Sequence, residues 1–272
     1  MRKYFRVYLP FSLNSGKRMI SYKFSVYIWV LCSILGTFIN YYLWMAIYRN
    51  SSTGILGGLS RNEMITYIFM SYIASGIAMI DISEWINEDV VEGNVAMNLI
   101  KPINYRTRLI FEAFGEMLFH FFASAALIWV GVELYRVFGL GLSVTPVQNM
   151  LLFLLSAVMS FFIYVMFEFC FGMIAFFTTY IFGLQMVKAA LLSFLTGQLI
   201  PLSFFPEVLQ RVFDFLPFSS MVYAPVMIYL GKYSTGELLF VLGRQFVWIL
   251  LLYLLGSLIW RKVTKRLVVL GG

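Results

Sequence analysis

The 272-residue chain has little charge: 12% of its residues are Asp, Glu, Lys or Arg, whereas soluble domains carry about 25%. Hydrophobic residues make up 61% of it, and a fold of this length cannot hide so much apolar surface from water. With 7 prolines and 2 cysteines, the composition also excludes proline-rich disordered and disulfide-rich secreted classes. What remains is an integral membrane protein.

Catalytic and metal-binding motifs are missing as well. A single histidine excludes a multi-histidine metal site within one chain, and Cys32 and Cys170 lie alone in apolar runs without ligand spacing. The phosphate-binding pattern G-x-x-x-x-G-K-[ST] does not occur, nor do H-E-x-x-H and G-x-S-x-G. We therefore expect no enzyme activity, no metal and no cofactor bound by this chain.

Long uncharged stretches are present instead, and about 20 apolar residues suffice for a helix to cross a membrane. They predict an all-α polytopic membrane protein with six transmembrane helices. The predicted spans are approximately residues 24–48, 63–81, 109–132, 147–173, 183–200 and 238–260.

The stretch 215–231 is also uncharged, but its prolines argue against a seventh span. Proline removes a backbone donor and breaks helices, and unsatisfied backbone groups are costly in lipid. We expect residues 201–235 to form a re-entrant pair of short helices on the outer side, marked by Pro201, Pro206, Pro217 and Pro225.

Lysine and arginine gather in residues 2–23, in the loop that ends at residue 108 and in the tail from residue 261. The positive-inside rule therefore places both termini in the cytoplasm. Membrane orientation thus accounts for the net charge of +7, and we expect no nucleic-acid partner. The basic, aromatic segment 1–23 is typical of an amphipathic helix on the inner leaflet; a disordered tail is the alternative.

The hydrophilic loop 81–105 carries five acids ahead of Gly93 and apolar residues at helical spacing. Ser83 is a plausible N-cap, and Gly93 suits a helix C-terminus. This pattern predicts a short cytoplasmic helix that docks a soluble partner, with a solvated connecting loop as the alternative. The expected docking residues are Ile82, Glu84, Trp85, Ile86, Glu88, Asp89, Val90 and Glu92.

Glu168 is the one charged residue between Val137 and Val187. An ionisable group at membrane depth must face protein or water, which leaves two roles open. Glu168 either forms a packing ion pair, with Lys188 as the candidate partner, or lines the substrate path together with Asn40 of the first span.

Glu112, Glu116 and His120 recur every four residues and share one face of the third span. We interpret them as a helix-end cluster paired with Arg106 and Arg108. A proton relay is the less favoured alternative.

Two segments carry a family resemblance. Glu92–Asn104 (EGNVAMNLIKPIN) is similar to the G…L-(L/I)-K-P-(I/L)-N segment of ABC-2-type transporter permeases of the daunorubicin- or viologen-exporter-like branch. The stretch Gly197–Pro206 (GQLIPLSFFP), followed by Leu216–Phe218, Tyr223–Pro225 and Leu230–Gly231, resembles the re-entrant region of that branch. The resemblance covers essentially the whole chain.

The resemblance implies that residues 1–272 form one transmembrane domain, a permease subunit of a multidrug-type exporter. Such a permease pairs with a second one, the same or a related chain, and with two copies of a cytoplasmic ATPase that uses ATP and Mg²⁺. The helix at about 82–92 would be the coupling helix. The substrate, drug-like, peptide or lipid, would leave a bacterial cell through the plasma membrane.

A stand-alone secondary carrier or channel is the alternative function. Secondary carriers usually show internal repeats with paired broken helices, and one broken segment is visible here. Substrate identity and the choice between a homodimer and a heterodimer stay open.

Overall fold

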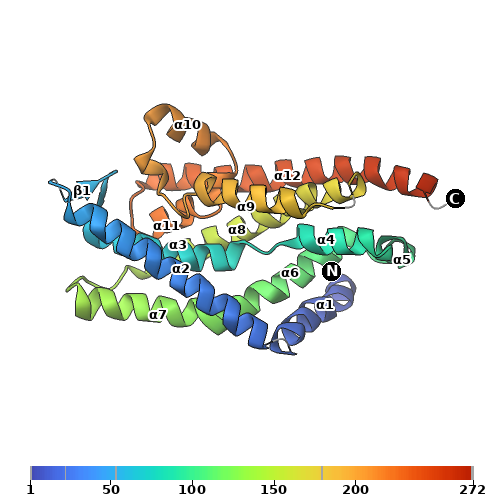
Figure 1. Ribbon diagram of the computed structural model, residues 1–272, viewed down its shortest axis with the longest axis horizontal. Coiled ribbons are helices and arrows are strands. Elements are labelled where there is room, and N and C mark those ends of the chain that lie inside the picture. The colour runs from blue at the N-terminus through green and yellow to red at the C-terminus, as the bar shows by residue number, and fades with distance from the viewer. Residues whose placement is uncertain (1, 22, 53, 179, 271–272) are drawn as a thin grey trace.

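The computed structural model describes residues 2–21, 23–52, 54–178 and 180–270. These residues form an elongated bundle whose longer helices run mainly along one axis (Figure 1). The one sheet in the described part of the chain is a short hairpin, β1 (Ile55–Leu56) paired with β2 (Leu59–Ser60). The predicted all-α class is confirmed.

Five helical segments of the described chain are long and apolar enough to cross a membrane: Phe24–Arg49, Arg61–Val91, Tyr105–Gly139, Val147–Phe176 and Thr235–Lys265. They overlap with α2 (Lys23–Arg49), with α3 (Arg61–Ala78) and α4 (Ile82–Val91), with α6 (Tyr105–His120) and α7 (Ala126–Leu134), with α8 (Val147–Gly172) and with α12 (Thr235–Leu270). Two π-helical turns, η1 (Phe121–Ala125) and η2 (Tyr135–Gly139), join and extend α6 and α7, and the 3-10 turn η3 (Met173–Phe176) extends α8.

The fifth predicted span is shorter than expected. Helix α9 (Phe182–Leu195) has 14 residues, or about 21 Å at 1.5 Å per residue, against the about 30 Å of a bilayer core. The predicted span reaches residue 200 because the sequence stays apolar up to that position. The chain leaves the helix at Thr196, and Gly197 adopts a left-handed conformation with φ 79°.

Helix α1 (Arg2–Ser21) packs lengthwise along α6. The Ser12 hydroxyl donates to the Phe111 carbonyl at 2.5 Å, and the Tyr8 ring stacks on Phe111 with 5.5 Å between centroids. A Cβ atom on Gly115 would collide with the backbone of Ser12, so glycine is what permits this close approach. The basic segment is therefore an ordered helix, whereas its position at the inner leaflet stays a prediction.

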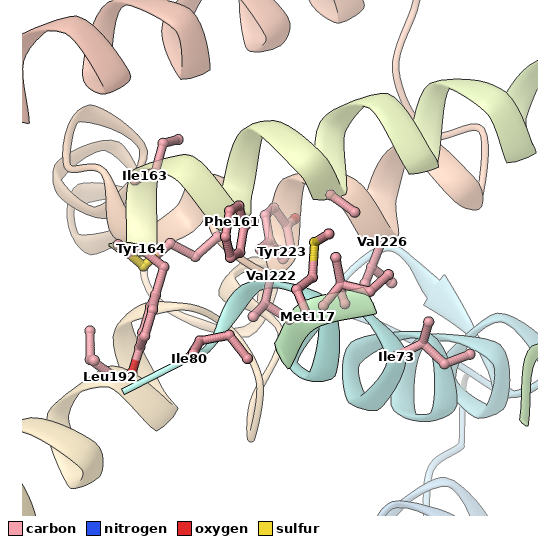
Figure 2. Close-up of a cluster of buried hydrophobic side chains, with 14 of the residues drawn as sticks. Ile73, Ile80, Met117, Phe161, Ile163, Tyr164, Leu192, Val222, Tyr223 and Val226 are labelled. Atoms are coloured by element: carbon pink, nitrogen blue, oxygen red, sulfur yellow. The ribbon is translucent and has the colours of Figure 1, made fainter. Parts of the chain in front are cut away.

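The core lies around α8. Its Phe153, Phe161 and Phe169 are essentially without exposed surface, and they pack among side chains of α3, α6, α11 and α12. Figure 2 shows Phe161 with Met117 of α6 and Tyr223 of α11 in this cluster. Because the apolar residues of α8 face protein on several sides, α8 is the central helix of the bundle.

Residues 201–235 are broken into short helices, as the prolines predicted: η4 (Leu202–Phe204), α10 (Glu207–Phe215), η5 (Phe218–Ser220) and α11 (Tyr223–Tyr229). Pro201, Pro206 and Pro217 each stand directly before one of these helices, where the missing N–H costs nothing. Pro225 lies in the first turn of α11. Helix α10 projects from the bundle (Figure 1).

Buried polar contacts hold this region to the bundle. The fully buried Gln245 of α12 donates to the carbonyl oxygens of Ser220 at 2.9 Å and Ser156 at 3.3 Å. Just before this region, Tyr67 of α3 donates to the Gly197 carbonyl at 2.6 Å. The location of the region on the outer side stays a prediction.

Candidate functional site

The predicted loop helix exists as α4 (Ile82–Val91). Gly93 follows its C-cap Glu92 with φ 74°, in agreement with the predicted helix end. The N-cap prediction is wrong: Asp81 occupies that position, and Ser83 lies inside the first turn. The hydroxyl and the N–H of Ser83 both donate to Glu168 of α8, so this serine ties the loop helix to the membrane helix.

The apolar face of α4 is occupied within the chain. Ile82 and Ile86 are 0% exposed, and Ile86 packs directly over Gly172 of α8. Trp85 is half-buried beneath the Arg18 guanidinium of α1, 5.2 Å from the ring centroid. The expectation that Ile82 and Ile86 dock a soluble partner therefore has to be corrected, because the chain's own membrane helix covers them.

Asp89 also points into the protein. It accepts hydrogen bonds from the Tyr105 hydroxyl at 2.8 Å, the Arg108 guanidinium at 2.9 Å and the Asn98 amide at 3.2 Å. These bonds connect α4 to α5 (Asn94–Ile100) and α6. Asp89 thus fixes the position of α5. Among the other predicted docking residues, Glu84, Glu88 and Glu92 are exposed and Val90 is half-buried.

Helix α5 presents apolar side chains to the outside. Met97 is 60% and Ile100 76% exposed, and Val91 and Leu99 beside them are exposed too, whereas Val95 and Asn98 are buried below. Figure 1 shows α5 at the end of the molecule, beyond α4. We call Val91, Met97, Leu99 and Ile100 the α5 patch. This patch was not predicted, although apolar residues in the otherwise hydrophilic loop were an available signal.

Glu168 sits in a buried ion pair. The Lys188 ammonium of α9 lies 2.7 and 2.8 Å from the two Glu168 carboxylate oxygens and 3.3 Å from Asp81. The Glu168 side chain is 0% and the Lys188 side chain 4% exposed. Of the two roles left open, the structure shows the ion pair, and Glu168 is not among the residues that line the groove described below.

Two further side chains complete this cluster. The Tyr164 hydroxyl donates to Asp81 at 2.9 Å, and the Gln185 amide donates to the Ser83 hydroxyl at 2.9 Å. The cluster consequently joins the start of α4, α8 and α9. Neither Tyr164 nor Gln185 was predicted, because no pattern in the sequence links positions about 80–100 residues apart.

A groove of about 840 Å³ runs between α2, α3 and α9. Asn40 lines it, together with Ser33 and Thr37 on the same face of α2. The spacing of these three residues (i, i+4, i+7) is one helix face, and this polar stripe in an apolar span was a signal of the groove. At the α4 end the lining consists of Asp81, Glu84, Asn87, Glu88 and Lys188.

The charged face of α6, formed by Glu112, Glu116 and His120, has one of its two predicted arginine partners. Arg108 contacts Glu112 at 3.6 Å, and Glu116 lies 3.6 Å from Arg18 and 3.8 Å from His120. Arg106, in contrast, donates to Ser257 of α12 at 2.7 Å and stacks over Tyr253. The helix-end interpretation is thus confirmed for Arg108 and wrong for Arg106.

The described residues contain no group of three or more His, Cys, Asp or Glu side chains that could hold a metal ion. A family model described as "ABC-2 family transporter protein" matches residues 23–271. No curated protein and no solved structure matches the chain. The match extends over most of the sequence and supports the family, without distinguishing the daunorubicin- or viologen-exporter-like branch.

Proposed function

Since the chain belongs to the ABC-2 transporter family, we propose that it is the permease subunit of an ATP-driven exporter. The observation that carries the proposal is the exposed α5 patch, on a chain whose membrane helices also border a groove. The patch supplies a contact for an energy-providing partner and the groove supplies a path. The chain has no phosphate-binding loop, so ATP and Mg²⁺ belong to that partner.

The α5 patch is a suitable docking surface because contact with lipid does not account for the exposure of its apolar side chains. Met97, Leu99 and Ile100 of the patch lie between the candidate membrane spans that end at Val91 and begin at Tyr105, within a loop that the positive-inside rule places in the cytoplasm. Apolar side chains gathered at an aqueous end mark a protein interface. Two copies of a soluble ATPase, one for each permease, would receive α5 in an apolar recess.

The network below the patch would transmit force. Asn98 of α5 accepts from Arg108 of α6 at 2.8 Å and donates to Asp89 of α4. A rigid connection of this kind moves α4, α5 and α6 together when the partner moves α5. Through Ser83 and Lys188, the start of α4 is in turn tied to α8 and α9, and α9 lines the groove.

The groove would form the substrate path, with Asn40 in its wall. Its open side is bordered by α2 and α9, whose apolar residues are largely exposed. A second permease, the same or a related chain, would face this side. We propose that a hydrophobic or amphipathic substrate leaves the cell through the plasma membrane along the path between the two.

The double substitution Met97→Asp and Ile100→Asp tests the docking surface. We expect the variant to fold normally but to lose co-purification with its ATPase, because two carboxylates would enter an apolar interface. Val208→Asp, on exposed α10 at 74% exposure, is the matched control. Undiminished co-purification of the double variant would refute docking at α5, and transport by the permease alone in vesicles without ATPase would favour a stand-alone carrier.

A further inference from the structure

We propose that a second groove, between α2, α3 and α7, binds a hydrocarbon chain of a membrane phospholipid. Its volume is about 470 Å³, within the about 300–1,000 Å³ that is typical of small-molecule sites. All of its lining residues lie inside candidate membrane spans. We call it the α2–α7 groove; it is separate from the groove that contains Asn40, although Thr37 and Tyr72 border both.

The α2–α7 groove opens toward lipid. Ile34, Phe38 and Tyr41 line it from α2 with the spacing i, i+4, i+7, which is one helix face. Its floor is buried, because Ile65 of α3 is 3% and Val132 of α7 is 7% exposed. Phe38, in contrast, is 44% exposed. The groove is therefore closed toward the protein and open toward the surroundings of the bundle, which are hydrocarbon at the depth of a membrane span.

The interior of the groove suits an alkyl chain. Its two threonines use their hydroxyl protons within their own helices: Thr37 donates to the Ser33 carbonyl at 2.9 Å, and Thr66 donates to the Asn62 carbonyl at 3.1 Å. Apart from Arg136 at one end, the remaining side chains that line the groove are aliphatic or aromatic. A polar ligand would find few partners here, whereas an alkyl chain would gain close contact with the rings.

A chain in the groove would also hold α2 in place. Within the described part of the protein α2 packs mainly against α3, and little of its apolar surface is buried. An empty groove would leave its walls without contacts on one side. Because a bound chain contacts α2, α3 and α7 together, it differs from the lipids that surround any membrane span.

The position of basic residues indicates where the headgroup lies. Arg136 lines one end of the groove but pairs with Glu133 at 3.0 Å. Arg61, one helical turn before Ile65 on α3, is exposed and forms no ion pair with any described residue. Its charge is thus available to a phosphate. The positive-inside rule places these ends of the helices on the outer side, so the phospholipid belongs to the outer leaflet.

Bromine atoms on an acyl chain quench the fluorescence of a tryptophan that they contact, which locates a bound chain. Phe38→Trp places the probe at the groove, and Phe246→Trp, on α12 at 56% exposure, is the matched control outside both grooves. Each full-length variant is titrated in detergent with phosphatidylcholine that carries brominated chains, and the signal of the wild type is subtracted. We expect half-quenching at position 38 at an about tenfold lower lipid concentration than at position 246.

Gly131→Leu fills the groove from α7, because Gly131 lines it and a Cβ atom there meets no neighbour. Added to Phe38→Trp, this substitution should raise the half-quenching concentration to that of position 246. Gly243→Leu on α12, where a Cβ atom also meets no neighbour, is the control and should leave the quenching at position 38 unchanged. Thermal unfolding verifies that each variant is folded.

Equal half-quenching concentrations at positions 38 and 246 would overturn the lipid site, as would undiminished quenching at position 38 when Gly131→Leu is present. Weaker quenching at position 38 than at position 246 would show that protein, such as a second permease, covers the groove, and would overturn it too. The comparison of the two positions does not need the Gly131→Leu variant, so it decides the matter even if that variant fails to fold. Neither ATPase nor transport is measured, so the result is independent of the proposed export function.

Discussion

At the scale of single residues, the Glu168–Lys188 pair is the most deeply buried charged contact among the described residues. Taking two charges out of water is costly, and their attraction repays this only with good geometry and further hydrogen bonds. Here Ser83 donates to Glu168, and Lys188 also contacts Asp81. The pair is therefore stable as a unit and vulnerable to loss of either member.

Glu168→Gln should destabilise the protein by about 3–5 kcal/mol, the usual cost of breaking a buried pair from one side. The stability of the detergent-purified variant is measured by thermal unfolding, with Glu207→Gln as an exposed control that should change little. Adding Lys188→Met should recover part of the loss. Normal stability of Glu168→Gln combined with reduced export would instead support a role for Glu168 in the substrate path.

At the scale of elements, the contact between α1 and α6 depends on one glycine. Gly115 lies against the Ser12 backbone, where a Cβ atom has no room. Overpacking of a tight contact commonly costs about 1–3 kcal/mol. The same contact places Arg18 over Trp85 of α4, so α1 also supports the loop helix.

Gly115→Ala should push α1 away from α6. In a background in which Cys32 and Cys170 are replaced, cysteines at Tyr8 and Phe111, whose rings stack in the native protein, should crosslink less readily when Gly115→Ala is added. Gly131→Ala in α7, where a Cβ atom meets no neighbour, is the matched control. Equal crosslinking in all three proteins would show that the α1–α6 contact does not depend on Gly115.

At the scale of the whole molecule, the distribution of Lys and Arg predicts which end faces the cytoplasm. The α5 patch and the short helices of residues 201–235 are kept apart by the length of the bundle (Figure 1). The positive-inside rule assigns α5 to the cytoplasm. The docking of an ATPase at α5 requires this orientation.

Single cysteines in a background without Cys32 and Cys170 test the orientation in intact cells. Cysteines at Glu207 and Lys232 should both react with an impermeant thiol reagent, whereas a cysteine at Met97 should react only after permeabilisation. Labelling of position 232 only after permeabilisation, with position 207 labelled in intact cells, would favour a seventh crossing through this region.

The class of fold and most of the helices follow from local features of the sequence. Low charge and long apolar runs predict transmembrane helices, because a helix forms all of its backbone hydrogen bonds within one segment in lipid. The prolines from Pro201 to Pro225 interrupt the helices locally. Gly93 ends α4 for an equally local reason. The family resemblance followed from short motifs, which are also local.

Which face of each helix is buried depends instead on how the helices pack. Ile82 and Ile86 were predicted to dock a partner because an amphipathic pattern does not specify whether its apolar face contacts the same chain or another protein. In the structure both side chains are buried within the chain, and Ile86 packs against α8. Likewise Glu168 meets Ser83 and Lys188 through contacts between elements distant in the sequence. Such contacts depend on how helices pack, which hydropathy and spacing along one helix do not specify.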